Sequence, residues 1–172
     1  GLLRAAGVHN GQLDLYQGLA GDRPTTMRLV VQFMPVLTEL SLKFNQLGDA
    51  GVGIVCKGLQ NNNSLKVLDL SVNQIHSVEE LSKVLGSCVL TKLWLAENEI
   101  GSSGVRTMLD ACCASHTLCE CSLRANGVNS MAREKMMREY QPRGLVFNHL
   151  GDVTRRTVFP PPIASVAQSP AP

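Results

Sequence analysis

Apolar residues recur along the chain in one fixed pattern. From Leu37 to Leu47 the sequence follows L-x-x-L-x-L-x-x-N-x-L, and close copies of this pattern begin at Leu65, Leu90 and Leu118. The successive copies therefore start 28, 25 and 28 residues apart. Alternation of apolar and polar residues around each central L-x-L predicts a short strand whose leucines point inward. Four copies in phase indicate a repeat architecture.

The rest of each repeat has helical spacing. Small or apolar residues recur at intervals of four, and such a series lines one face of a helix that can pack on the sheet. The copy that begins at Leu65 is three residues shorter, which predicts a helix over about 78–85 that lacks most of one turn. The three complete series are Gly51, Val55 and Leu59, then Gly104, Met108 and Cys112, then Ala132, Met136 and Tyr140.

An asparagine follows each predicted strand at the same place in the repeat. Its amide can donate to and accept from backbone groups of the turn that would otherwise be buried without partners. We therefore predict a structural role, and not a catalytic one, for Asn45, Asn73, Asn98 and Asn126.

The four motifs resemble those of leucine-rich repeat proteins, and the 28-residue spacing is similar to that of the ribonuclease-inhibitor-like subfamily. The resemblance is clear over residues 37–140 and weaker over residues 8–150. It implies an α/β solenoid shaped as a horseshoe arc, with a parallel sheet on the inside and helices on the outside.

Both ends of the repeat region are degenerate, and we assign residues 1–150 to one repeat domain. Leu13-Asp-Leu15 predicts a weak strand, Asp22 a cap for the helix that follows, and residues 144–148 a closing edge strand. Leu2 and Leu3 resemble part of an earlier helix, so we expect a domain truncated at its N-terminus. Residues 151–172 hold five of the eight prolines, which predicts an extended tail.

Composition and charge restrict the possible partners. The net charge of +2 and the absence of a basic run argue against nucleic acid, and the few aromatic residues provide no platform for stacking bases. The longest apolar stretch, residues 29–37, is interrupted by Gln32 and Pro35 and is too short to span a membrane. Without a recognisable secretion signal, we expect the six cysteines to be reduced and the protein to be intracellular and cytoplasmic.

The densest group of potential ligands or nucleophiles comprises Cys112, Cys113, His116, Cys119 and Cys121. The repeat register places Cys112 and Cys121 at leucine positions, where a thiol serves as a small apolar side chain. The remaining three side chains fall short of a closed zinc site, so we expect no metal. No nucleophile elbow or phosphate-binding loop is present, and we expect no catalytic site, cofactor or small-molecule substrate.

The predicted functional surface is the exposed, concave face of the sheet. Trp94 is the one tryptophan of the chain, and its place between Leu93 and Leu95 predicts that it points outward. In parallel register, Asp69 and Ser122 should flank Trp94 on the neighbouring strands. The residues predicted to bind a partner are Trp94, Asp69, Phe44, Val72, Glu97, Arg124, Lys92 and Ser122.

This surface favours a non-enzymatic protein–protein interaction module, or a scaffold subunit of a larger complex. An alternative is a GTPase-activating protein, since Ran GTPase activators have similar repeats; Arg124 is the arginine best exposed on the predicted face. Ribonuclease inhibition would require a longer arc with an acidic inner face, and Lys43, Lys92 and Arg124 argue against it.

Overall fold

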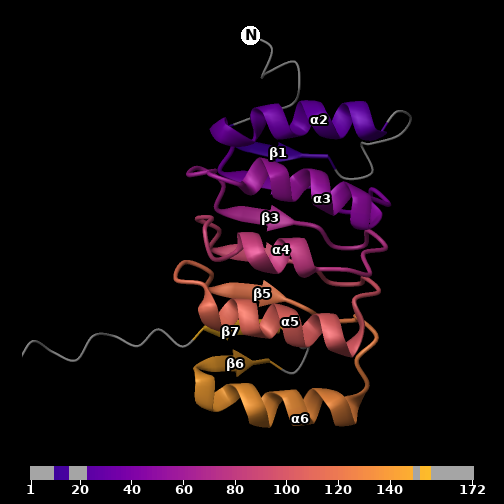
Figure 1. The fold of residues 1–172 in the computed structure, drawn as a ribbon, viewed down its shortest axis with the longest axis vertical. Coiled ribbons are helices and arrows are strands. Elements are labelled where there is room, and N and C mark those ends of the chain that lie inside the picture. Colours follow the sequence, from indigo (N-terminus) through magenta and orange to yellow (C-terminus); the bar gives the residue numbers. More distant parts are fainter. Residues whose placement is uncertain (1–9, 16–22, 149–151, 156–172) are drawn as a thin grey trace, which may run out of the picture.

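The computed structural model describes residues 10–15, 23–148 and 152–155, in which helices and strands alternate along one stack (Figure 1). The helices are α2 (Arg23–Phe33), α3 (Gly48–Leu59), α4 (Glu79–Val84), α5 (Gly101–Ala114) and α6 (Ser130–Tyr140). Two short 3-10 helices are η1 (Met34–Val36) and η2 (Gln141–Arg143). The strands are β1 (Gln12–Asp14), β2 (Glu39–Ser41), β3 (Val67–Asp69), β4 (Lys92–Trp94), β5 (Glu120–Ser122), β6 (Leu145–Phe147) and β7 (Asp152–Arg155).

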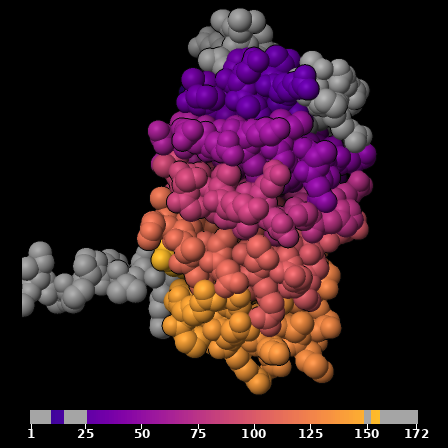
Figure 2. All heavy atoms as spheres, viewed as in Figure 1, coloured from indigo at the N-terminus to yellow at the C-terminus, as the bar shows by residue number. Residues whose placement is uncertain are grey.

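The strands form one open sheet in the order β1-β2-β3-β4-β5-β7-β6. Strands β1 to β5 are parallel, and their central residues pair in one line: Leu13, Leu40, Leu68, Leu93 and Cys121. This register confirms the predicted alignment of the repeats, including the degenerate first strand. Figure 2 shows the repeats as successive bands along the long axis of the molecule. The fold is the predicted α/β solenoid.

The core lies between the sheet and the helices. The second leucine of the L-x-L motif is completely buried in three repeats, as Leu42, Leu70 and Leu95, and nearly so in the fourth, as Leu123. The helix faces predicted from the spacing of four supply the opposite side, where Val55 and Met108 are also completely buried. The shortened repeat has the shortened helix that its length predicts, because α4 contains only six residues against twelve in α3. None of the described helices is long and apolar enough to cross a membrane.

The four repeat asparagines form a ladder that links successive turns. Oδ1 of Asn73 accepts hydrogen bonds from the backbone N–H groups of Asn45 (2.9 Å) and Leu47 (3.3 Å). Nδ2 of the same side chain donates to the carbonyls of Leu42 (2.9 Å) and Ser71 (3.1 Å). Asn98 and Asn126 make equivalent bonds one and two repeats later. The predicted structural role of these asparagines is confirmed.

The residue before each asparagine has a left-handed backbone. Its φ angle is 61° at Phe44, 57° at Val72, 56° at Glu97 and 53° at Ala125. A residue with a β-carbon pays roughly 1–2 kcal/mol for this conformation. The conformation recurs at one place in four repeats, and the N–H groups of Phe44, Val72 and Glu97 donate to carbonyls of the next repeat. We therefore assign it to the turn that brings each asparagine inward. The strain is therefore part of the fold.

The C-terminal end of the sheet differs from the prediction. Residues 144–148 do form an edge strand, β6, but β7 lies between β6 and β5 and pairs antiparallel with both. The body therefore extends to Arg155 instead of ending at residue 150, and the segment expected to be a tail begins with a strand. Val153 is buried in the core, and the Arg155 guanidinium donates to the carbonyls of Ser115 and Cys113, at the C-terminal end of α5. Expectations for Leu2, Leu3, Asp22 and residues 156–172 lie outside the described residues.

Candidate functional site

The sheet face that is turned away from the helices contains a hollow of about 230 Å³, which we call the Trp94 hollow. Its floor consists of three small side chains on adjacent strands or just beyond their ends: Ser71, Ala96 and Ser122. Their exposed fractions are only 5%, 4% and 7%. Because larger residues surround these small ones, the depression follows directly from side-chain size. The wall consists of Lys43, Asp69, Trp94, Glu120, Arg124 and Asp152.

Trp94 stands in the middle of one row of residues that crosses the sheet. It pairs with Asp69 of β3 on one side and with Ser122 of β5 on the other, which confirms the predicted flanking residues. Ser122 in turn pairs with Asp152 of β7. The indole is half-buried, so part of its surface remains open to solvent. A rigid, amphipathic side chain in this position is suited to contact another protein.

Ion pairs hold part of the wall. Lys92 Nζ lies 3.1 Å from Glu120 Oε2, and Arg124 Nη2 lies 3.6 Å from Glu97 Oε1. All four side chains are substantially exposed, so these pairs orient the wall more than they stabilise the fold. Lys92 and Glu97, both predicted to bind a partner, therefore lie next to the wall and pair with two of its residues.

Two carboxylates of the wall are fixed by hydrogen bonds. Oδ1 of Asp69 accepts from the backbone N–H of Ser71 at 2.8 Å. The carboxylate of Asp152 accepts from the Ser122 hydroxyl and from Nδ2 of Asn148, the latter at 2.9 Å. Within the described part of the chain, neither Asp69 nor Asp152 forms an ion pair. Each carboxylate is thus held in one orientation and can still accept further hydrogen bonds.

Four of the predicted partner-binding residues do not line the hollow: Phe44, Val72, Lys92 and Glu97. Phe44 and Val72 do not line the hollow, because the left-handed turn carries them beyond the strand ends. Phe44 is 37% exposed and lies beneath Lys43, whose Nζ is 5.6 Å from its ring centre. Ser122 lines the hollow but is buried, since β7 lies beside it and its hydroxyl donates to Oδ1 of Asp152. It therefore belongs to the floor of the hollow.

The structure adds wall residues that the predicted set did not contain. Asp152 was missed because residues 151–172 read as a tail. A signal for it exists in the alternation of polar and apolar residues from Asp152 to Thr154, which follows Gly151 in a potential hairpin with residues 145–147. Glu120 and Lys43 also line the hollow and were not among the predicted partner-binding residues. The hollow brings together Asp69, Trp94, Arg124 and these three residues.

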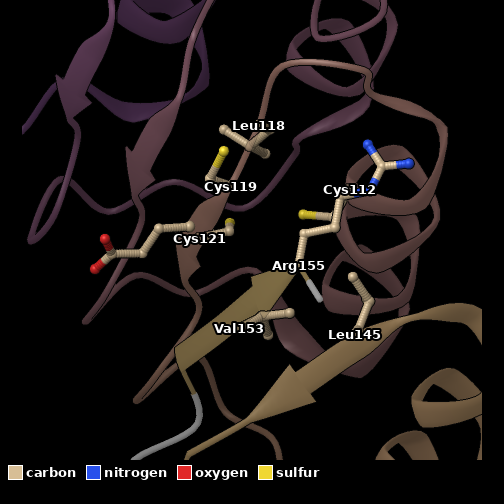
Figure 3. Close-up of a pocket in the computed structure, with 8 residues that line it drawn as sticks. Cys112, Leu118, Cys119, Cys121, Leu145, Val153 and Arg155 are labelled. Atoms are coloured by element: carbon tan, nitrogen blue, oxygen red, sulfur yellow. The ribbon is translucent and has the colours of Figure 1, made fainter. Parts of the chain in front are cut away.

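The cysteine-rich segment forms a separate and much smaller pocket, of about 10 Å³, on the core side of the sheet. Figure 3 shows Cys112 from α5 and Cys121 from β5 directed toward one another, with Val153 and Leu145 beside them. Both thiols are buried, as their leucine positions predict. Among the described residues, no group of three or more His, Cys, Asp or Glu side chains could hold a metal ion.

Two of the buried thiols have raised pKa values. A hydrogen bond with Cys112, followed by burial, raises the pKa of Cys121 well above its ordinary value. Burial likewise raises the pKa of Cys56 to about 11. Because the thiolate is the reactive form, the raised pKa makes Cys121 and Cys56 weaker nucleophiles at neutral pH. Both side chains contribute to the core.

Comparison with known proteins agrees with the repeat architecture. Residues 33–53, 61–78 and 86–109 match the family model of the leucine-rich repeat. The chain is 36% identical to a ribonuclease inhibitor of Mus musculus over 98 residues and 38% identical to one of Sus scrofa over 98 residues. It is 34% identical over 119 residues to the NACHT, LRR and PYD domains-containing protein 3 of Bos taurus.

The matches cover only part of each protein. They span 54% of this chain but 21% of either ribonuclease inhibitor, and 64% of this chain but 12% of the bovine protein. The chain thus spans about a fifth or less of the length of these relatives.

Proposed function

Because this chain is a leucine-rich repeat protein of the ribonuclease-inhibitor-like type, we propose that it is a non-enzymatic module that binds another protein through the Trp94 hollow. The observation that carries the proposal is that Trp94 is half-buried on the sheet and lines a hollow whose other wall residues are charged. A large aromatic of this kind is a frequent anchor of protein interfaces.

The proposed mechanism is rigid display. The wall residues come from β3, β4, β5 and β7 and from the turns after β2 and β5. Strand pairing together with the asparagine ladder fixes their relative positions. A surface that is already ordered loses little conformational freedom when a partner binds. Few contacts around Trp94 are then enough to give measurable affinity, while the charged wall selects among partners.

Binding is favoured over GTPase activation by the surroundings of Arg124. Its guanidinium is paired with Glu97 at 3.6 Å and forms part of the wall. An arginine that stabilises transferring phosphate must direct its charge to the nucleotide, and an ion pair with a neighbouring carboxylate opposes this. The proposal also includes a scaffold role in a larger assembly and a location in the reducing cytoplasm. The location is supported by the six cysteines, which are all free thiols.

The test is comparative capture from native extract. Immobilised wild-type protein, Trp94→Ala and a control variant on the helical face, Glu134→Ala, are incubated with the same extract, and retained proteins are identified by mass spectrometry. We expect at least one protein to be retained stoichiometrically by the wild type and by Glu134→Ala, and to be depleted at least tenfold with Trp94→Ala. Equal retention by all three proteins would remove the hollow as the binding site.

A further inference from the structure

The Trp94 hollow has a slot whose two sides differ in chemistry. Along the row that crosses the sheet, Trp94 is followed by the small Ser122 and then by Asp152. Adjacent strands lie about 4.8 Å apart, so the backbones of Trp94 and Asp152 are separated by roughly two such spacings. Ser122 is buried between them and fills little of that space. An aromatic side chain therefore faces a carboxylate across a narrow polar floor.

The charge of this slot is not satisfied within the described chain. Among the described residues, the carboxylate of Asp152 accepts from two neutral donors, the Ser122 hydroxyl and the Asn148 amide. Asp69, on the other side of Trp94, accepts only from a backbone N–H and likewise has no ion pair among the described residues. The neighbouring charges of β5 and its turn are already paired: Glu120 with Lys92, and Arg124 with Glu97.

We propose that this slot receives an arginine side chain of the partner protein, with its guanidinium between the indole of Trp94 and the carboxylate of Asp152. The inference rests on the proposed function and specifies the chemistry of the partner. A guanidinium is planar, stacks on an aromatic face and pairs with a carboxylate through two parallel N–H groups. Asp69 adds a second negative charge on the far side of the indole. Strand β7, which belongs to no repeat, completes the site.

The structure also explains why a cation and not an anion suits this slot. Lys43 is the one wall cation without an ion pair among the described residues, and it lies over the Phe44 ring at 5.6 Å, at the β2 end of the hollow. The side toward β7 holds Glu120 and Asp152 against the paired Arg124. A phosphate or carboxylate in the slot would face Asp152 directly.

Trp94 is the only tryptophan, so its fluorescence reports on this site alone. The probe is N-acetyl-L-argininamide, and the comparison compound is N-acetyl-L-citrullinamide, which has nearly the same shape without the charge. We expect a saturable change in emission with a millimolar dissociation constant for the arginine compound, and at least tenfold weaker binding of the citrulline compound. Non-saturable quenching, equal responses to both compounds, or no response would overturn the proposal.

Isosteric variants locate the bound cation. Asp152→Asn retains the acceptor for Ser122 and should weaken binding of the arginine compound at least fivefold, whereas Asp69→Asn should weaken it about twofold. The matched control is Glu99→Gln, which removes a carboxylate that pairs with His76 at 3.1 Å, away from the hollow. Unchanged affinity in Asp152→Asn would refute the slot. If that result occurred while Trp94→Ala still abolished capture of a partner, the interaction function would stand and only the arginine specificity would fall.

Discussion

At the scale of single residues, the repeat depends on polar side chains at buried positions, where apolar side chains are more usual. Each repeat asparagine is nearly or completely buried, yet its amide serves backbone groups of two successive turns. Buried backbone groups without partners are costly, and three consecutive turns share this solution. The sequence pattern was sufficient to predict this role, because the same residue recurs in phase with the leucines.

We expect Asn73→Ala to lower the free energy of unfolding by about 3 kcal/mol. The substitution leaves the N–H groups of Asn45 and Leu47 without their shared acceptor and removes the donor to Ser71. Urea denaturation of the variant and the wild type measures the difference. The control is Asn63→Ala, at an exposed position in the loop before β3, where a change within about 0.5 kcal/mol is expected. Equal effects of the two substitutions would show that the ladder contributes little.

At the scale of elements, the strands and helices of the repeats were predictable and the closing strand was not. Repetition places Leu40, Leu68, Leu93 and Cys121 in register, and it also indicates that the second helix is short. Strand β7 has no copy elsewhere in the chain, and its four residues alternate too briefly to outweigh the prolines that follow. Its position depends on antiparallel pairing with β5, some thirty residues away, which no local pattern encodes.

This one missed strand accounts for the main errors at the site. With β7 in place, Ser122 changes from an exposed partner-binding residue to a buried floor residue, and Asp152 enters the wall. The misplacement of Phe44 and Val72 has another cause, since alternation along a strand ceases where the backbone turns left-handed. The pairing of Asp69 with Trp94 on neighbouring strands was predictable because the register of the strands follows from the repeat.

The role of β7 can be tested with two adjacent substitutions. Val153→Ala should lower the free energy of unfolding by about 2 kcal/mol, because it truncates a buried side chain that lies beside Leu109 of α5 and Met136 of α6. Thr154→Ala, one residue further on the exposed side of the same strand, should change it by less than about 0.5 kcal/mol. Chemical denaturation provides both values. A neutral Val153→Ala would mean that residues 152–155 do not belong to the folded body.

At the scale of the whole molecule, the stacked repeats place the residues that stabilise the fold and the residues that can contact a partner on opposite faces of the sheet. Each repeat buries its leucines against its neighbours, and stability is shared across these contacts. Because side chains alternate along a strand, the residue next to each buried leucine points to the other face of the sheet, where the hollow lies. Adjacent side chains therefore serve different purposes, and substitutions at neighbouring positions should affect different properties.

Trp94 and Leu95 provide the sharpest test of this separation. Leu95 is completely buried, and Leu95→Ala should lower the free energy of unfolding by roughly 2 to 5 kcal/mol. Trp94 is only half-buried, so we expect Trp94→Ala to cost about 1 kcal/mol from lost contacts with the wall, while weakening the affinity for a partner by about 2 kcal/mol or more. Thermal unfolding followed by circular dichroism measures stability, and titration of folded protein measures affinity. If Trp94→Ala unfolded the protein and left the affinity of the remaining folded molecules unchanged, Trp94 would belong to the core and the display mechanism would be wrong.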